Sequence, residues 1–330
     1  MIRVFYGLAR TPVDAATLAD IAVPDMHLIR IFGAAVAWLA SVAISQPGAH
    51  HQLVDPLTLS DDDFARHRDP ATWRGLSVSR IEFHEERGAW RLFRIANVRN
   101  PRGPLWFVPH DNENAGFEVG LAGVRAYGGV MIVVDSGIAE DGRRRNAAVD
   151  RGGPIDPNRN FRDGTPLYAN TILADVHRGA LPIIALHTNS PGFDTRNSRC
   201  NQADPPGRGE VSIRFCDDVM QPSQSQSRAW PFDDDDSLAY VAYRSGRAPY
   251  SAWCGKALAL ADFNVVFERV SVSDGSLSNY ALLRGLPYVN FETQERGLDP
   301  VRLAESRNRL VAMIDRAMER CTAPTTRLAR

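Results

Sequence analysis

The stretch from Gly103 to Gly116, GPLWFVPHDNENAG, decides how the middle of the chain folds. Its apolar first half predicts a buried strand, and its second half begins a helix that Gly128 ends. Between strand and helix lies a turn that carries His110 and, three residues later, Glu113. The sequence therefore delivers an imidazole and a carboxylate side by side at the end of a strand.

Two further apolar runs also end on polar side chains. The run LPIIALH, residues 181–187, ends on His187, and the run YVNFE, residues 288–292, ends on Glu292. Strands of a mostly parallel sheet carry functional groups at their carboxyl ends, so we expect these groups to meet. His110, Glu113 and His187 are the ligand set of a catalytic zinc that keeps one position open for water. Glu292 would then act as the general base and acid, passing a proton from water to a leaving nitrogen.

The segment IDPNRNF, residues 155–161, lies between the two histidine segments and supplies Asn158 and Arg159. A guanidinium beside an amide is suited to gripping a carboxylate through paired hydrogen bonds. We therefore expect these two residues to bind a carboxylate of the substrate.

Strand-like and helix-like runs alternate along the chain, which predicts an α/β domain with a mixed sheet. Strands are expected at residues 76–83, 90–98, 104–110, 129–137, 181–187, 263–272 and 288–292, and helices at 114–128, 166–179 and 299–321. Residues 188–250 contain a long polar stretch with four consecutive aspartates at 233–236. This stretch is interpreted either as a lid over a site or as a loosely ordered insertion. Its acidic run could hold calcium, but a solvated loop is favoured because calcium loops interleave their carboxylates with glycine and other oxygen donors.

Composition limits the partners of the protein. With 330 residues and 44% hydrophobic residues, the chain can bury a large core. Its 38 basic and 39 acidic residues nearly cancel, so no overall field favours nucleic acid or an anionic membrane. No nucleic-acid partner is expected.

Residues 1–43 are interpreted as an N-terminal extension with a signal peptide. Arg30 precedes an apolar stretch at residues 31–44 that is short for a bilayer span, and Ser41-Val42-Ala43 are small residues of the kind a signal peptidase accepts. This predicts a catalytic domain at residues 44–330, exported to the periplasm or secreted, with no membrane span after cleavage. If the apolar stretch belongs to the domain core instead, a cytoplasmic location follows.

Four cysteines lie in the part of the chain that we expect to be exported, and an even number in an oxidising compartment favours disulfides. The preferred pairing joins Cys200 to Cys216 and Cys254 to Cys321. No pair has the close spacing of a zinc-thiolate site.

Taken together, these motifs resemble the zinc carboxypeptidases of the funnelin type, the M14 peptidases. The resemblance rests on His110 to Glu113, on the run from Asn158 to Phe161, on His187 and on Phe291-Glu292, in the family's order. The late segment DGSLSNYALLRGLPYVNFETQERG is also similar, and the resemblance covers residues from about 75 to 320.

The resemblance implies a mixed eight-stranded sheet sandwiched by helices. It implies a metallocarboxypeptidase, a zinc hydrolase that removes a C-terminal residue from a peptide. Zn²⁺ would be the cofactor, bound by His110, Glu113 and His187. Arg159, helped by Asn158, would hold the free carboxylate of the substrate, and Glu292 would be catalytic.

Two features depart from the family's pattern. The family places an arginine upstream of Asn-Arg, and here Arg143, Arg144 and Arg145 all qualify, with Arg145 taken as the substrate-binding candidate. The family's mobile tyrosine has no counterpart near Val270, and Tyr280 is the nearest tyrosine downstream. Its loss weakens the case for an ordinary protein-digesting activity.

Two other functions compete with the carboxypeptidase. HDNE, DPNR and LHTNS also resemble the aspartoacylase and succinylglutamate desuccinylase branch, which cleaves N-acyl amino acids. A non-catalytic protein that uses Arg159 to bind a carboxylate is the third candidate. An exported carboxypeptidase of this kind could trim cell-wall peptides.

Overall fold

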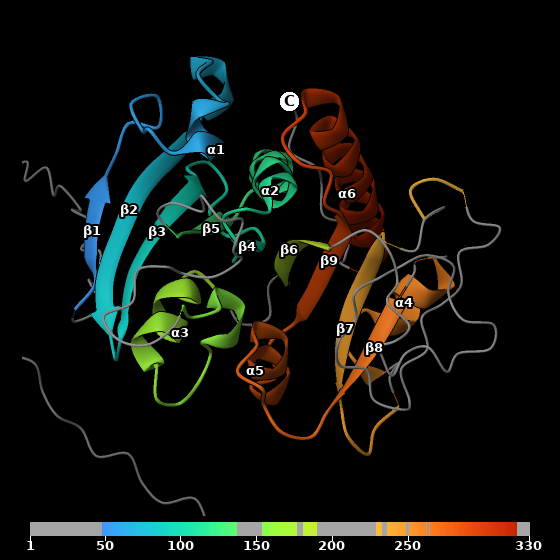
Figure 1. Ribbon diagram of the computed structural model, residues 1–330. Coiled ribbons are helices and arrows are strands. Elements are labelled where there is room, and N and C mark those ends of the chain that lie inside the picture. Colours follow the sequence, from blue (N-terminus) through green and yellow to red (C-terminus); the bar gives the residue numbers. More distant parts are fainter. Residues whose placement is uncertain are drawn as a thin grey trace, which may run out of the picture. The chain divides into compact units, whose positions relative to one another are not determined.

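A computed structural model describes residues 48–136, 154–176, 181–189, 229–232, 236–248, 251–261, 263 and 265–321. The described strands form one nine-stranded mixed sheet in the order β1-β2-β3-β5-β4-β6-β9-β7-β8 (Figure 1). The strands are β1 (His50–Leu53), β2 (Leu76–Glu85), β3 (Gly88–Asn97), β4 (Leu105–Val108), β5 (Val130–Asp135), β6 (Ile183–Asn189), β7 (Leu238–Arg244), β8 (Val265–Val270) and β9 (Tyr288–Gln294).

The α/β class and the mixed sheet are confirmed, whereas the expected number of eight strands is wrong by one. Two strands were not expected from the sequence. The short edge strand β1 is exposed along its whole length and is held by antiparallel pairing with β2. Strand β7 lies inside the range 188–250, which the sequence suggested to be an insertion, and it pairs with both β9 and β8.

The middle of the sheet is parallel, and this direction places the polar strand ends together. Strands β5, β4, β6 and β9 run parallel to their neighbours in that order. On one side β3 joins β5 in antiparallel pairing, and on the other side β7 joins β9 in the same way. The carboxyl ends of β4, β6 and β9 therefore lie at one edge of the sheet.

Helices cover both faces of the sheet (Figure 1). One core contains side chains of α2 (Asn114–Tyr127), α4 (Gly255–Leu260) and α6 (Pro300–Cys321). The other core contains side chains of α3 (Pro166–Ile172) and α5 (Leu277–Leu283). Short helices complete the described elements, namely α1 (Asp62–Ala65), η1 (Pro70–Trp73) and η2 (Pro157–Arg159). Within the described ranges, no helix is long and apolar enough to cross a membrane.

Small residues allow α2 to lie close against the sheet. A Cβ atom at Gly123 would lie 2.7 Å from the ring of Trp106, which is fully buried on β4. The indole nitrogen of Trp106 donates a hydrogen bond to the carbonyl of Gly128 at 3.0 Å, just beyond the end of the helix. This packing fixes α2, whose first turn follows Glu113, relative to β4, which leads to His110.

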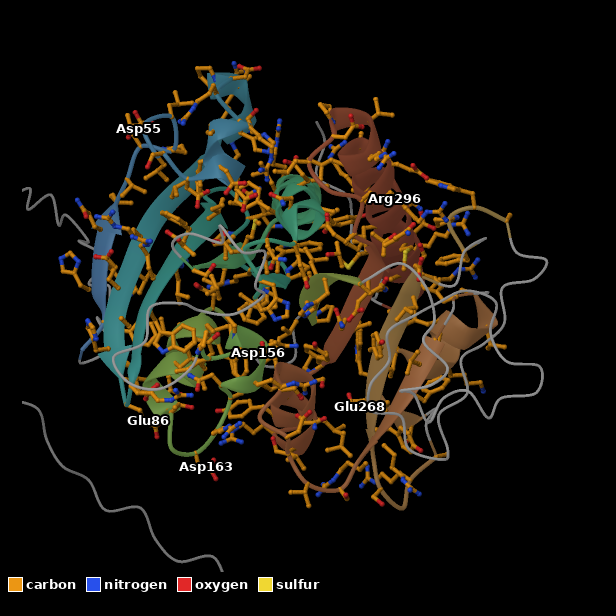
Figure 2. The ribbon with its side chains drawn as sticks, in the orientation of Figure 1. Asp55, Glu86, Asp156, Asp163, Glu268 and Arg296 are labelled. Carbon is orange, nitrogen blue, oxygen red and sulfur yellow. A yellow bond between two sulfur atoms is a disulfide. The ribbon has the colours of Figure 1, made fainter. Side chains whose placement is uncertain are left out.

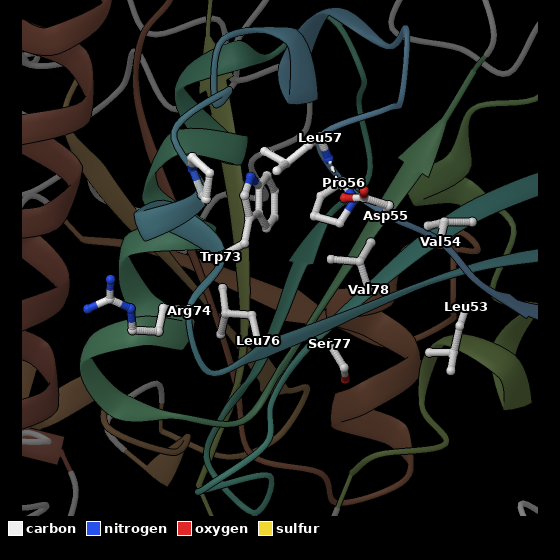
Figure 3. A pocket seen from close by; sticks show the side chains of 11 residues that line it. Leu53, Val54, Asp55, Pro56, Leu57, Trp73, Arg74, Leu76, Ser77 and Val78 are labelled. Atoms are coloured by element: carbon white, nitrogen blue, oxygen red, sulfur yellow. Dashed lines mark hydrogen bonds between the residues drawn. The ribbon is translucent and has the colours of Figure 1, made fainter.

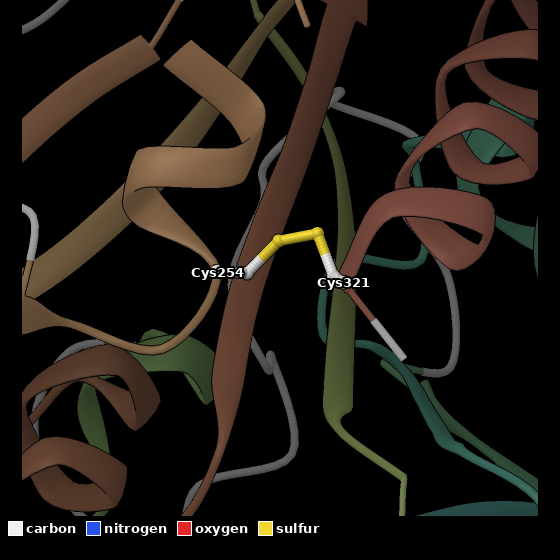
Figure 4. Close-up of a disulfide and its surroundings, with 2 residues drawn as sticks. All are labelled: Cys254 and Cys321. Atoms are coloured by element: carbon white, nitrogen blue, oxygen red, sulfur yellow. A yellow bond between two sulfur atoms is a disulfide. The ribbon is translucent and has the colours of Figure 1, made fainter. Parts of the chain in front are cut away.

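A disulfide joins Cys254, just before α4, to Cys321, the last residue of α6 (Figure 4). Their Cα atoms are 5.1 Å apart, within the usual range for a disulfide. This half of the preferred pairing is confirmed. Cys200 and Cys216 lie outside the described residues, as do the signal peptide expected at residues 1–43 and the aspartates 233–235.

We expect the double variant Cys254→Ser/Cys321→Ser to be less stable than the wild type by up to about 4 kcal/mol. The bridge closes a loop between residues 67 positions apart, and an open loop of this length gains considerable entropy in the unfolded chain. Urea denaturation of the two proteins measures the difference in free energy of unfolding. Equal midpoints and slopes would show that the bridge does not stabilise the fold.

Candidate metal centre

Three neighbouring strands bring four titratable side chains to one edge of the sheet. His110 follows β4 by two residues, His187 lies on β6, and Glu292 lies on β9. His187 and Glu292 are register partners on parallel strands, so their side chains point to the same face. Glu113 is the residue before the first turn of α2, and its backbone N–H donates to the carbonyl of His110 at 3.0 Å. The turn between β4 and α2 thus directs both His110 and Glu113 toward β6.

The side chains of His110, Glu113 and His187 converge on one point. The Nδ1 atom of His110 lies 2.9 Å from Oε1 of Glu113, and the Nδ1 atom of His187 lies 3.2 Å from Oε2. The two Nδ1 atoms are 3.2 Å apart. All three residues are buried, with exposed fractions of 8%, 1% and 4%.

This donor set fits zinc. Two ligand nitrogens at the usual zinc distance lie about 3.3 Å apart in tetrahedral geometry, close to the spacing of the two Nδ1 atoms. One atom from each of the three residues lies within 4.8 Å of the others, as a shared metal requires. Glu113 is further fixed because its Oε2 accepts the backbone N–H of Thr188 at 2.9 Å. These three residues form the candidate metal centre.

Electrostatics at the candidate metal centre favour positive charge. Burial alone lowers the pKa of His110, but Glu113 and Asp156 raise it to about 9. Burial raises the pKa of Glu113, yet the neighbouring imidazoles hold it well below its ordinary value. The carboxylates of Glu113 and Asp156 therefore stabilise positive charge between the two imidazoles. A bound divalent metal would supply such a charge.

Asp156 orients His110, a role that the sequence did not reveal. Its Oδ1 lies 3.0 Å from Nε2 of His110, which leaves Nδ1 directed toward Glu113. A carboxylate in this position fixes the tautomer and ring direction of a metal-binding histidine. Its signals in the sequence are the DPNR motif and the Asp-Pro-Asn turn within it, in which Oδ1 of Asp156 also accepts the N–H of Asn158 at 2.9 Å. Asp156 lies near α3, toward the middle of the molecule (Figure 2).

The two expected carboxylate-binding residues lie on the same short helix as this turn. The side-chain Oδ1 of Asn158 is buried and accepts no hydrogen bond within the described residues. Arg159 forms an ion pair with Asp274 through Nη1, and its side chain is 38% exposed. The third candidate, Arg145, lies outside the described residues together with Arg143 and Arg144.

Glu292 is half-buried on β9, and its Oε1 accepts a hydrogen bond from Nδ2 of Asn290 at 2.7 Å. Burial raises the pKa of Tyr240 and of Tyr288 well above the ordinary value, and the charges of Glu292 and Glu268 raise both further. Tyr280, the nearest tyrosine downstream of Val270, is buried with an exposed fraction of 8%, and its ring lies 5.8 Å from that of Phe161.

A groove of about 530 Å³ lies away from the candidate metal centre, beside β1 and β2 (Figure 3). Its lining is mostly apolar, with Asp55 and Arg74 as the charged members. Asp55 already accepts the backbone N–H of Leu57 at 3.0 Å. Apart from Asp55, the lining residues of this groove include no side chain that would act as a general acid or base. The lining residues are Leu53, Val54, Asp55, Pro56, Leu57, Pro70, Trp73, Arg74, Leu76, Ser77 and Val78.

The fold and site define a mixed α/β protein with a candidate two-histidine, one-carboxylate metal centre. No protein-family model and no curated protein matches the chain. Solved structures to which it is similar include the ectoine utilization protein EutE (DoeB) from Ruegeria pomeroyi, at 14% identity and a TM-score of 0.40, covering 75% of this chain and 67% of that one. A succinylglutamate desuccinylase from Silicibacter sp. TM1040 is also similar, at 14% identity and a TM-score of 0.40. The match covers 84% of this chain and 68% of the desuccinylase chain.

A candidate metallopeptidase from Shewanella denitrificans OS217 is similar at 14% identity and a TM-score of 0.37, covering 82% of this chain and 95% of that one.

Proposed function

We propose that this protein is a zinc-dependent hydrolase that cleaves an amide bond close to a free carboxylate of its substrate. The observation that carries the proposal is the convergence of His110, Glu113 and His187 at the edge of the sheet where Glu292 is the register partner of His187. Zinc bound there would supply a Lewis acid that polarises the scissile carbonyl and the attacking water.

We assign each side chain one role in this reaction. Glu292 takes a proton from the attacking water and gives it to the leaving nitrogen as the carbon–nitrogen bond breaks. Asp156 contacts Nε2 of His110, so the Nδ1 atom of this histidine would be the one that binds the metal. Arg159 and Asn158, on the same turn as Asp156, hold the carboxylate of the substrate through charge-assisted hydrogen bonds.

Within this class, we propose removal of the C-terminal residue of a peptide. The similarity of the late segment around Phe291-Glu292 to carboxypeptidases and the signal peptide expected at residues 1–43 support this choice. Export would place the enzyme in the periplasm or outside the cell, and a cell-wall peptide is then a candidate substrate. The deacylation of an N-acyl amino acid is the second candidate, supported by HDNE, DPNR and LHTNS and by the lack of a mobile tyrosine.

A panel of four substrate types distinguishes these activities. We expect the zinc-loaded protein to cleave peptides with a free C-terminal carboxylate and to leave the matched C-terminal amides intact, because Arg159 needs an anionic partner. N-acyl amino acids and purified muropeptides complete the panel, and released amino acids are quantified by chromatography.

Each result has a defined meaning. Activity on N-acyl amino acids alone would move the protein to the deacylase branch. Release of a diamino acid from muropeptides would identify a cell-wall substrate. Equal cleavage of free and amidated peptides would contradict the role of Arg159, and no hydrolysis in the presence of bound zinc would contradict the proposed function.

A further inference from the structure

The guanidinium of Arg159 is held by a carboxylate that the sequence did not suggest. Asp274 lies between β8 and α5, and its Oδ2 forms an ion pair with Nη1 of Arg159. The side chains are 38% and 41% exposed. An ion pair this open to solvent adds little to stability, so its effect on the position of Arg159 is the more informative property.

Asp274 is itself fixed on its other oxygen. Its Oδ1 accepts the backbone N–H of Ser276 at 2.9 Å and the side-chain amide of Asn279 at 2.8 Å. Ser276 caps α5, since its hydroxyl accepts the N–H of Asn279, and both residues are almost fully buried. These hydrogen bonds therefore hold the carboxylate of Asp274 in a fixed position, so its ion pair with Arg159 costs little further conformational entropy.

The backbone fixes the same two segments to each other. The carbonyl of Gly275 accepts the N–H of Phe161 at 2.9 Å, which ties the turn before α5 to the end of η2. Gly275 has a φ of +88°, and a Cβ atom there would lie 2.6 Å from the carbonyl oxygen of Arg159. Only glycine allows this close approach.

Arg159, Asp274 and the candidate base Glu292 all act on the pKa of one tyrosine, Tyr288. The hydroxyl of Tyr288 is influenced by Glu268 and Glu292, which raise its pKa beyond the effect of burial, and by Arg159, which lowers it. Asp274 acts on the same hydroxyl. The charges of Arg159, Asp274 and Glu292 therefore all reach the hydroxyl of Tyr288.

We propose that Asp274 is a positioning residue for substrate binding: it engages Nη1 of Arg159 and presents the Nε–Nη2 edge of the guanidinium to the substrate carboxylate. Within the described residues, neither Nε nor Nη2 of Arg159 donates a hydrogen bond. That edge matches the two oxygens of a carboxylate. This inference rests on the proposed function, because it assigns Arg159 to a substrate with a free carboxylate.

The variant Asp274→Asn tests this role, since it removes the charge and keeps the shape of the side chain. We expect KM for a free-carboxylate substrate to rise about fivefold, the effect of losing a solvent-exposed charge pair, while kcat changes less than about twofold. The matched control is Asp163→Asn, which removes the exposed ion pair of Asp163 with Arg284 between the same two segments. Figure 2 marks Asp163 on the loop near α3. We expect this control to leave KM unchanged.

A double-mutant cycle separates positioning from a general loosening of the fold. In an Arg159→Gln background, Asp274→Asn should have no further effect on KM, because the guanidinium that it positions is gone. Additive effects of the two substitutions would overturn the proposal, as would an unchanged KM in Asp274→Asn alone.

A binding measurement separates the test of Asp274 from the test of the proposed function. Calorimetry with the zinc-loaded protein and a dipeptide analogue that carries a free carboxylate but no scissile amide bond measures Kd without turnover. If the wild type binds the dipeptide analogue and hydrolyses no substrate, the proposed function fails, while a weaker Kd in Asp274→Asn still supports positioning. An equal Kd in the two proteins, or no binding by the wild type, would overturn it.

Discussion

Replacing Glu292 by glutamine is expected to lower kcat by about 10²- to 10⁴-fold, the usual contribution of general acid–base catalysis. The amide has nearly the same shape as the carboxylate, and its oxygen still accepts the hydrogen bond that Asn290 now donates at 2.7 Å. It has no pair of electrons basic enough to take a proton from water. The loss should therefore appear in kcat, with zinc content and melting temperature close to those of the wild type.

The control for this variant is Glu268→Gln on β8. Both Glu268 and Glu292 raise the pKa of Tyr288, so both contribute to the field in this part of the protein. Only Glu292 is the register partner of His187. A loss of kcat in both variants would indicate a field effect, and a Glu292→Gln variant with at least half of the wild-type kcat would place the base elsewhere.

The variant His187→Ala is expected to contain almost no zinc, compared with about one ion per chain in the wild type, and to have no measurable activity. Catalytic zinc sites normally have three protein ligands, and removing one of them leaves only His110 and Glu113 to hold the ion. Elemental analysis after dialysis measures the zinc, and the substrate panel measures the activity. His50→Ala, at an exposed position on β1, is the control and should keep its zinc.

A partial loss of zinc affinity in a variant of Asp156 would strengthen the assignment of the three zinc ligands. Asp156 contacts His110 but is not a candidate ligand, so Asp156→Asn should weaken zinc binding by about 10- to 100-fold rather than abolish it. Competition with a chelator of known affinity measures this range. Zinc retained at one ion per chain in His187→Ala would contradict the proposed ligand set.

The features that the sequence predicted well are local. The apolar run before His110, the run that ends at His187 and the helix 114–128 each have a clear pattern within about fifteen residues, and each lies where it was expected. The pairing of Cys254 with Cys321 was also anticipated. The parallel arrangement of buried strands then brings their ends together, so the geometry of the candidate metal centre follows from simple rules of sheet structure.

The features that the sequence missed depend on distant partners. The polar run of β1 is a strand only because β2 pairs with it, and β7 lies in a polar region where β9 and β8 supply its hydrogen bonds. Asp156 and Asp274 gain their importance from His110 and Arg159, which lie 46 and 115 residues away. No local periodicity carries such information.

The bridge between Cys254 and Cys321 makes the last part of the protein a covalent ring. Strand β8, helix α5, strand β9 and helix α6 all lie between the two cysteines, and β9 carries Glu292. Val272, which is 79% exposed between β8 and α5, is a point within this ring that a protease can reach. A single cut there opens the backbone but releases no fragment, because the bridge keeps both pieces attached until a reductant breaks it.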